Sequence, residues 1–238
     1  MEERLQKIIA ESGYTSRRKA EELIEKGKVS VNGEIVNKLG TKVKRSDDIL
    51  FEGVMLERPE HIYFLLNKPR GVISTVSDEY ERKTVIDLID TDERIFPIGR
   101  LDYDTTGIIL LTNDGELTNV LTHPNSGVPK TYLVKLDRII EIEDLYKIKE
   151  GITIDGKKVR TSHVKLKKAD KKKNDCFVEL TIYEGRNHII KRIFKSLGYN
   201  VDKLVRTHYA GLSLGTLQSG EYRELNKKEV HELYTYKR

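Results

Sequence analysis

The hydrophobic and polar positions of the first 57 residues follow a helical and then an alternating pattern. RLQKIIAES spaces its apolar residues along one face of a helix, and TSRRKAEELIEKGK predicts a second helix that Thr15 or Ser16 would cap. Valines alternate around Asn-Gly in VSVNGEIV, which is the strongest short signal for a β-hairpin. Residues 1–57 are therefore predicted to form a small helix–helix–hairpin module.

After a short polar linker at 58–61, apolar runs of strand length alternate with helical patterns. We expect strands at IYFLLNKP, GIILLTN, KTYLVKL and CFVELTIYEG, and helices at ELTNVLTHP, EIEDLYKIKEG and HIIKRIFKSLG. Their irregular spacing predicts an α+β domain over 62–238, with a mixed or antiparallel sheet and not a doubly wound parallel one. The charge run at 165–175 is predicted to be a solvated loop between two strands.

Composition limits the class of protein. The chain has 238 residues, 37% hydrophobic and 34% charged, with a net charge of +5, which weakly favours polyanionic partners. A single cysteine excludes an intramolecular disulfide and a zinc site with several thiolates. We find no apolar run of membrane-spanning length and no signal-peptide pattern at the N-terminus, so a cytoplasmic protein is expected.

Basic residues are concentrated at the start of the second predicted helix. Arg17, Arg18 and Lys19 lie where the helix dipole disfavours cations, and Lys28 follows the far end. Such a surface suits phosphate groups. An ordinary solvated Lys/Arg face would have the same composition, so charge alone leaves both interpretations open.

An arginine and two carboxylates precede one of the most apolar runs of the chain, in PIGRLDYDTTGIILLTNDG. Asp102 and Asp104 could bind a divalent cation, act as a nucleophile with an acid–base neighbour, or shape a turn. DYDTT also matches Asp-x-Asp-x-Thr of the phosphatases that phosphorylate an aspartate. That family places its acids after a buried strand, whereas here the apolar run follows them.

The N-terminal segment RLQKIIAESGYTSRRKAEELIEKGKVSVNGEIV resembles the S-four type of RNA-binding module over roughly residues 2–50. The SRRKAEELI helix and the VNG hairpin carry this resemblance. It implies binding to structured RNA through shape and phosphate contacts.

Four segments of the remaining chain resemble the motifs of pseudouridine synthases, in the order of that family. They are YFLLNKPRGVISTVSD, GRLDYDTTGIILLTNDGELTNVLTHP, KTYLVKL and EGRNHIIKRIFKSLG. The similarity is greatest to the branch that modifies ribosomal RNA, and within it to synthases acting on large-subunit RNA. It implies isomerisation of a uridine without a cofactor or metal. The implied partner is ribosomal RNA or a ribosomal subunit assembly intermediate, bound by a monomer.

The resemblance also implies roles for individual residues. Asp102 would be the catalytic aspartate, Tyr132 the tyrosine of the uracil pocket and Lys191 the basic partner of the aspartate. Arg100 would fill the place that the extruded base leaves in the RNA. The other basic residues that we expect to contact RNA are Arg17, Arg18, Lys19, Lys28, Lys68, Arg70 and Arg186.

The fourth segment departs from the family pattern. Ile189 stands where relatives carry glutamine, and Lys191 replaces a more usual arginine, which supplies the charge without the planar fork. An RNA-binding protein of the same fold that does not catalyse is therefore an alternative. His188 is expected to have an RNA-side or structural role, since the six histidines show no metal-ligand spacing.

Overall fold

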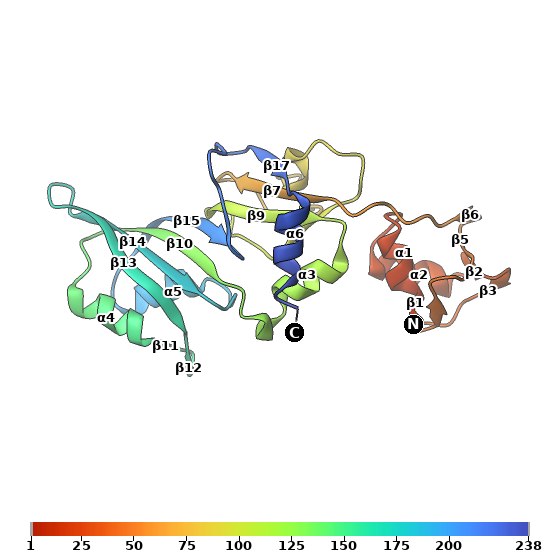
Figure 1. Cartoon of the computed structure of the whole chain (residues 1–238), viewed down its shortest axis with the longest axis horizontal. Coiled ribbons are helices and arrows are strands. Elements are labelled where there is room, and N and C mark those ends of the chain that lie inside the picture. Colours follow the sequence, from red (N-terminus) through yellow and green to blue (C-terminus); the bar gives the residue numbers. More distant parts are fainter. Residues whose placement is uncertain (1, 238) are drawn as a thin grey trace. The chain divides into compact units, whose positions relative to one another are not determined.

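The structure of the protein, a computed structural model, describes residues 2–237. These residues divide into two compact units (Figure 1). One unit extends to Ile62 and includes Thr91–Arg94 and Asn113–Gly115, and the other contains the remaining residues from Tyr63 onward. The boundaries expected from the sequence, 1–57, 58–61 and 62–238, stay a prediction, and they did not anticipate the two later segments.

The first unit folds as two helices beside short strands. Its elements are β1 (Glu2–Arg4), α1 (Leu5–Glu11), α2 (Arg17–Glu25), β2 (Val29–Val31), β3 (Glu34–Ile35), β4 (Lys42–Lys44), β5 (Ile49–Phe51) and β6 (Val54–Met55). Strands β3, β2, β5 and β6 form an antiparallel sheet in that order, and β1 pairs with β4. The buried core includes Leu5 and Ile9 of α1, Ile24 of α2 and Phe51 of β5.

The local signals for this unit are confirmed. The Ser16 hydroxyl accepts a hydrogen bond from the backbone N–H of Lys19 at 3.2 Å and caps α2. Asn32 and Gly33 join β2 to β3 with φ values of 51° and 87°. Positive φ at both positions is what a two-residue hairpin turn of the primed type requires.

The second part of the chain builds a larger α+β unit. Its elements are β7 (Tyr63–Lys68), η1 (Ile86–Leu88), β8 (Phe96–Ile98), β9 (Thr106–Thr112), α3 (Gly115–Thr122), η2 (Pro124–Ser126), β10 (Lys130–Leu136), α4 (Ile142–Glu150), β11 (Thr153–Ile154), β12 (Lys157–Lys158), β13 (Thr161–Asp170), β14 (Asp175–Ile182), α5 (Ile189–Ser196), β15 (Val201–Tyr209), β16 (Leu212–Ser213), β17 (Tyr222–Glu224) and α6 (Lys227–Tyr234).

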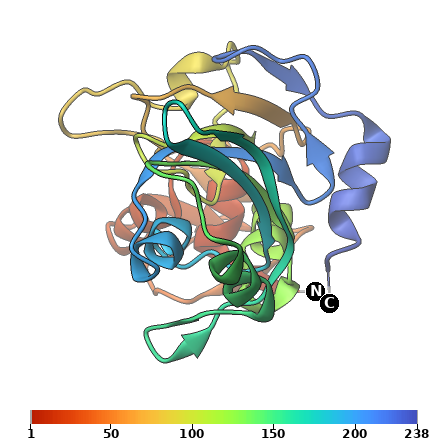
Figure 2. The same cartoon turned by 90° about the vertical axis from the view of Figure 1, so that its left-hand side faces the viewer.

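One mixed sheet organises this unit. Its strand order is β13-β14-β10-β15-β9-β7-β17, with β16 beside β15 and β8 beside β9. The β9–β15 pair is parallel, and the other pairs are antiparallel. Helices α3 and α6 pack on the β7–β9 part (Figure 1), where Leu117 and Leu233 join Ile108 in the core. Figure 2 shows β13 and β14 curving around α4 and α5. The α+β prediction is confirmed.

The charge run at 165–175 differs from the prediction. β13 continues to Asp170 and pairs with β14, so a loop does not occupy the whole run. Most side chains of this strand are exposed. Lysines on an exposed edge strand oppose pairing with other chains, and such a lysine-rich strand has the composition of a loop.

Among residues 2–237, no helix has the length and apolar character needed to cross a bilayer.

Gly107 determines how closely β9 approaches β15. It is paired with Arg206 in the parallel register, and its φ is 104°. A Cβ atom at this position would lie 2.2 Å from the carbonyl oxygen of Arg206. Glycine therefore lets the first residues of β9, which follow the acidic loop, lie against β15.

We expect Gly107→Ala to lower the free energy of unfolding by about 3 kcal/mol or more, because backbone atoms of β15 must move. Gly211→Ala is the matched control: its φ is 85°, but a Cβ there has nothing within 4 Å. Backbone strain alone should cost that variant about 1–2 kcal/mol. Chemical denaturation measures both, and equal losses would contradict the close-approach explanation.

Candidate active site

A cavity of about 820 Å³ opens on one face of β10 and β15. Its lining comes from the loop between β8 and β9, the segment after α3, the two strands, and the loop between β14 and α5. Lys130 and Tyr132 lie two residues apart on β10 and therefore share a face of the sheet. Tyr132 is directly opposite Arg206 of β15. These side chains form the floor of the cavity, and Asp102 lines it from the β8–β9 loop.

Backbone hydrogen bonds hold the acidic loop that carries Asp102. The N–H of Thr105 donates to the carbonyl of Asp102 at 3.1 Å, and the N–H of Gly71 donates to the carbonyl of Tyr103 at 2.8 Å. Ser74 Oγ donates to the carbonyl of Leu101 at 2.9 Å. A loop with so many satisfied backbone groups has a defined path.

Lys68, at the end of β7, lies beneath this loop and is completely buried. Its ammonium donates to the carbonyl oxygens of Pro69 and Asp102 at 3.1 Å and of Thr105 at 2.9 Å. Burial lowers the pKa of Lys68 to about 8, although the charges of Asp104 and Asp102 oppose the shift. The expected contact of Lys68 with RNA stays a prediction; in this structure its charge is used inside the protein to support the loop.

Two side chains from the α5 region, Lys191 and His188, flank Asp102. Lys191 Nζ is 3.8 Å from Asp102 Oδ2, and His188 Nε2 is 3.6 Å from Asp102 Oδ1. Lys191 makes its shorter contacts with Asp104, at 2.7 and 2.8 Å. Its ammonium therefore bridges the two carboxylates. Both side chains stay beyond hydrogen-bond distance of Asp102, so its oxygens are available to a ligand.

Asp104 is the main ion-pair partner of Lys191. The hydrogen bond from Lys191 holds the pKa of Asp104 below its usual range, against the effect of burial. This ion pair fixes the ammonium beside Asp102. Lys191 thus lies closer to Asp104, at 2.7 Å, than to Asp102, at 3.8 Å, and its role as the basic partner of Asp102 stays a prediction.

Arg100 and Arg70 are exposed near the acidic loop. Arg100 lines the cavity and forms no ion pair with Asp102 or Asp104 in the described part of the chain. Its guanidinium is therefore open to an external ligand. The charge of Arg70 contributes to the lowered pKa of Asp104, which places Arg70 on the side of the acids.

Arg186 supports the loop between β14 and α5. Its guanidinium pairs with Glu184 through Nε, and Nη1 donates to the carbonyl of Ile154 at 2.7 Å. These contacts use much of its donor capacity, and its expected contact with RNA stays a prediction. The neighbouring Ile189 is buried in the protein and lines the cavity.

The basic residues of α2 are on the surface. Arg17, Arg18, Lys19 and Lys28 are all exposed, and Lys19 forms an intrahelical ion pair with Glu22 at 2.8 Å. An exposed pair of this kind contributes little and can be exchanged for another anion. Their contact with RNA stays a prediction.

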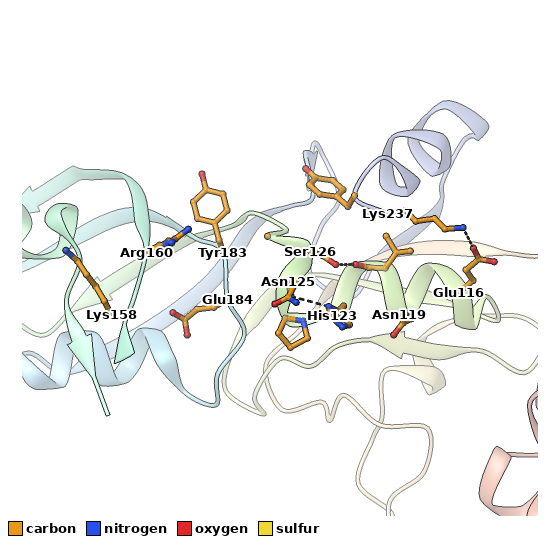
Figure 3. A pocket seen from close by; sticks show the side chains of 14 residues that line it. Glu116, Asn119, His123, Asn125, Ser126, Lys158, Arg160, Tyr183, Glu184 and Lys237 are labelled. Atoms are coloured by element: carbon orange, nitrogen blue, oxygen red, sulfur yellow. Dashed lines mark hydrogen bonds and ion pairs between the residues drawn. The ribbon is translucent and has the colours of Figure 1, made fainter. Parts of the chain in front are cut away.

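A second cavity, of about 850 Å³, adjoins the first. Both are lined by His123, Pro124, Lys158, Tyr183 and Glu184. Figure 3 shows Arg160 and Tyr183 on one side of this second cavity and Asn125 and Ser126 on the other. The two cavities therefore share a boundary lined with polar and aromatic groups.

Sequence reasoning missed several residues of the site. Strand alternation could have found Lys130, which shares the face of Tyr132. Arg206, in LVRTHYA, is only 3% exposed. The alternation of this strand puts the arginine at a position that faces the interior, and a cation at such a position could have indicated a site. No local pattern indicates that His188, with φ of 53°, approaches Asp102.

Comparisons with known proteins agree with this geometry. Residues 62–196 match the family RNA pseudouridylate synthase, and residues 3–49 match the S4 domain. The chain is 50% identical to ribosomal large subunit pseudouridine synthase B of Bacillus subtilis (strain 168), over 97% of this chain and 95% of that one. It is 38% identical to an uncharacterized RNA pseudouridine synthase of Aquifex aeolicus (strain VF5), over 98% and 94%. A crystal structure of a pseudouridylate synthase matches with a TM-score of 0.67 and 36% identity, over 97% and 99%.

Replacing the buried ammonium tests its support of the acidic loop. We expect Lys68→Met to lower the free energy of unfolding by at least about 2 kcal/mol, because it leaves buried carbonyl oxygens without a donor. Lys173→Met, in the exposed β13–β14 turn, is the control and should change stability by less than about 0.5 kcal/mol. Urea denaturation checks both; unchanged stability of Lys68→Met would contradict this role.

Proposed function

Because the chain belongs to the RNA pseudouridylate synthase family, which comprises RNA uridine isomerases, we propose that it converts one specific uridine of large-subunit ribosomal RNA to pseudouridine. The similarity to the B. subtilis large-subunit enzyme along nearly the whole chain supports this substrate. The observation that carries the mechanism is Asp102, whose free carboxylate lines a cavity beside Tyr132. The phosphatase alternative is wrong, because the chain belongs to a different family.

The reaction explains why one carboxylate suffices. Uracil is detached from its ribose, rotated and rejoined through carbon, so no electrons or external groups are exchanged. In the proposal Asp102 either bonds to the ribose or removes one of its protons, as a carboxylate beside an electron-deficient sugar can do. Lys191 lies beside this carboxylate, and the ring of Tyr132 stacks on uracil.

The target uridine must leave its helix or loop to reach the cavity, at an unstacking cost of a few kcal/mol. Arg100 would occupy the vacated position, and its exposure and its place in the cavity lining support this role. The second cavity adjoins the first and would take RNA next to the target (Figure 3). Tyr183 offers a stacking surface there, and Arg160 and Lys158 offer cations for phosphates.

The S4 domain would tether structured ribosomal RNA or an assembling subunit through the basic residues of α2. We infer that the protein acts as a monomer in the cytoplasm, where ribosomal RNA is processed. The non-catalytic alternative has lost its main support, because Ile189 is buried and Asp102, Tyr132 and Lys191 are all present at the cavity or beside it.

Substituting the two acids separately tests their different roles. Asp102→Asn should lower the rate at least about 10³-fold, because it removes the reacting carboxylate. Asp104→Asn keeps that group and should lose about tenfold, since only the hold on Lys191 weakens. The readout is the carbodiimide adducts that survive alkaline treatment, which mark pseudouridine, on a large-subunit transcript. Retained activity in Asp102→Asn would contradict the mechanism.

Removing residues 1–57 tests the tethering role. The shortened protein should bind intact ribosomal RNA at least about tenfold more weakly and with a smaller dependence on salt, because phosphate contacts release counterions. Its rate on a short substrate at saturation should stay close to that of the full chain. Filter binding at several salt concentrations gives the affinities. Full activity on intact ribosomal RNA would argue against tethering.

A further inference from the structure

Two cations in the floor of the first cavity have no role in the mechanism above. Arg206 is 3% exposed, and its Nε donates to the carbonyl of Ile108 at 2.7 Å. Its Nη2 is buried and has no hydrogen-bond partner among the described residues. A buried guanidinium with an unused donor carries an energetic cost, which a ligand with an acceptor would offset.

Lys130 lies next to this guanidinium. The Arg206 Cζ is 4.7 Å from the centre of the Tyr209 ring, and the Lys130 Nζ is 5.7 Å from the same centre. The Lys130 ammonium donates only a long hydrogen bond, 3.3 Å, to the carbonyl of Val128. Both cations therefore lie near the same aromatic ring, and each has few hydrogen-bond acceptors.

The acids of the cavity do not neutralise this floor. Asp102 and Glu184 are the acidic residues that line it. Glu184 is ion-paired with Arg186, and Asp102 lies beside Lys191 and His188. The floor under Tyr132 thus keeps an excess of positive charge, in a position where a base stacked on that tyrosine would contact it.

Resting on the proposed function, we propose that Arg206 and Lys130 stabilise the uracil anion that forms when the glycosidic bond breaks. The electron pair of the C1′–N1 bond leaves with the base and is spread over N1 and the two carbonyl oxygens. The same pair forms the C5–C1′ bond, after which C5 loses a proton and N1 gains one. No oxidant or co-reactant is needed, and cations fixed near the carbonyl oxygens lower the barrier to the first step.

A phosphate of the RNA backbone would suit the same two cations. The uracil anion is favoured because Arg206 is buried and directly opposite Tyr132, the residue on which the base is proposed to stack. The two ligands differ in one measurable respect. Stabilisation of a leaving anion matters less when the base is intrinsically a better leaving group, whereas a phosphate contact is indifferent to the base.

The test compares uridine with 5-fluorouridine at the target position of an RNA transcript. Fluorine withdraws electrons and makes the base a better leaving group. Under single-turnover conditions with saturating enzyme, Lys130→Met should lower the rate of uridine loss about 100-fold and that of 5-fluorouridine loss by tenfold or less. Chromatography of nuclease digests gives both rates. Lys130→Arg should recover most of the loss, and Lys173→Met should leave both rates unchanged.

A pH profile provides a second test. Burial lowers the pKa of Lys130 to about 8; the charge of Arg206 adds to this shift and that of Glu184 opposes it. The groups around Lys130 are Arg206 and Tyr209 of β15, Tyr132 of β10 and Glu184. Lys130 is cationic below this pKa, so the rate should fall above pH 8. Lys130→Arg stays charged, so its rate should fall by a smaller factor between pH 8 and pH 9 than that of the unmodified protein. The fall that remains is expected from Lys68, whose pKa is also about 8.

The outcomes separate this inference from the function on which it rests. If the unmodified protein isomerises neither substrate, the proposed function fails. If it isomerises uridine but Lys130→Met loses the same factor on both bases, or loses nothing, the anion-stabilising role is wrong. An equal loss on both bases together with weaker RNA binding would assign the floor to a phosphate. Identical pH profiles of the unmodified protein and Lys130→Arg would also overturn the inference.

Discussion

The position of Asp102 depends on a buried ammonium group. Lys68 lies at the end of β7, and its three hydrogen bonds go to backbone carbonyls of Pro69, Asp102 and Thr105. A charge in the interior is tolerated only where it is well supplied with partners, so the ammonium and the acidic loop stabilise each other. The support reaches Asp102 through its backbone, which leaves the side-chain oxygens free for a ligand.

The charges of the cavity are arranged in two groups. Beside the cavity, Lys191 is anchored by Asp104 and remains close to Asp102. In the floor, Lys130 and Arg206 both lie near the Tyr209 ring, at 5.7 and 4.7 Å from its centre. Breaking a glycosidic bond makes the sugar electron-deficient and the base electron-rich. A carboxylate at one side and cations at the other match both changes, which is the electrostatic requirement for this reaction.

The sequence predicts those parts of the fold that local pattern determines. Strands β7, β9, β10 and β14 are apolar runs, and α2 has both an N-cap and an apolar stripe, so their signals survive in any context. β13 was mistaken for a loop because the signal for an exposed edge strand lies in its pairing with β14, which composition does not reveal.

The site was predicted only in part, because contacts between distant segments are not visible in the sequence. Asp102, Tyr132 and Lys191 were found through motifs, but the two bases in NKPRG look equivalent in sequence. Only the tertiary structure buries Lys68 beneath the acidic loop and leaves Arg70 exposed. The bridge from Lys191 to Asp104 and the approach of His188 to Asp102 also join segments more than 80 residues apart in the chain.

The central claim is that this chain isomerises a uridine of large-subunit ribosomal RNA with Asp102. The most direct measurement maps pseudouridines in the ribosomal RNA of cells that lack the gene and carry either the unmodified chain or Asp102→Asn. The account predicts one large-subunit position that is modified with the unmodified chain and unmodified with the variant. An identical map in the two strains would contradict it.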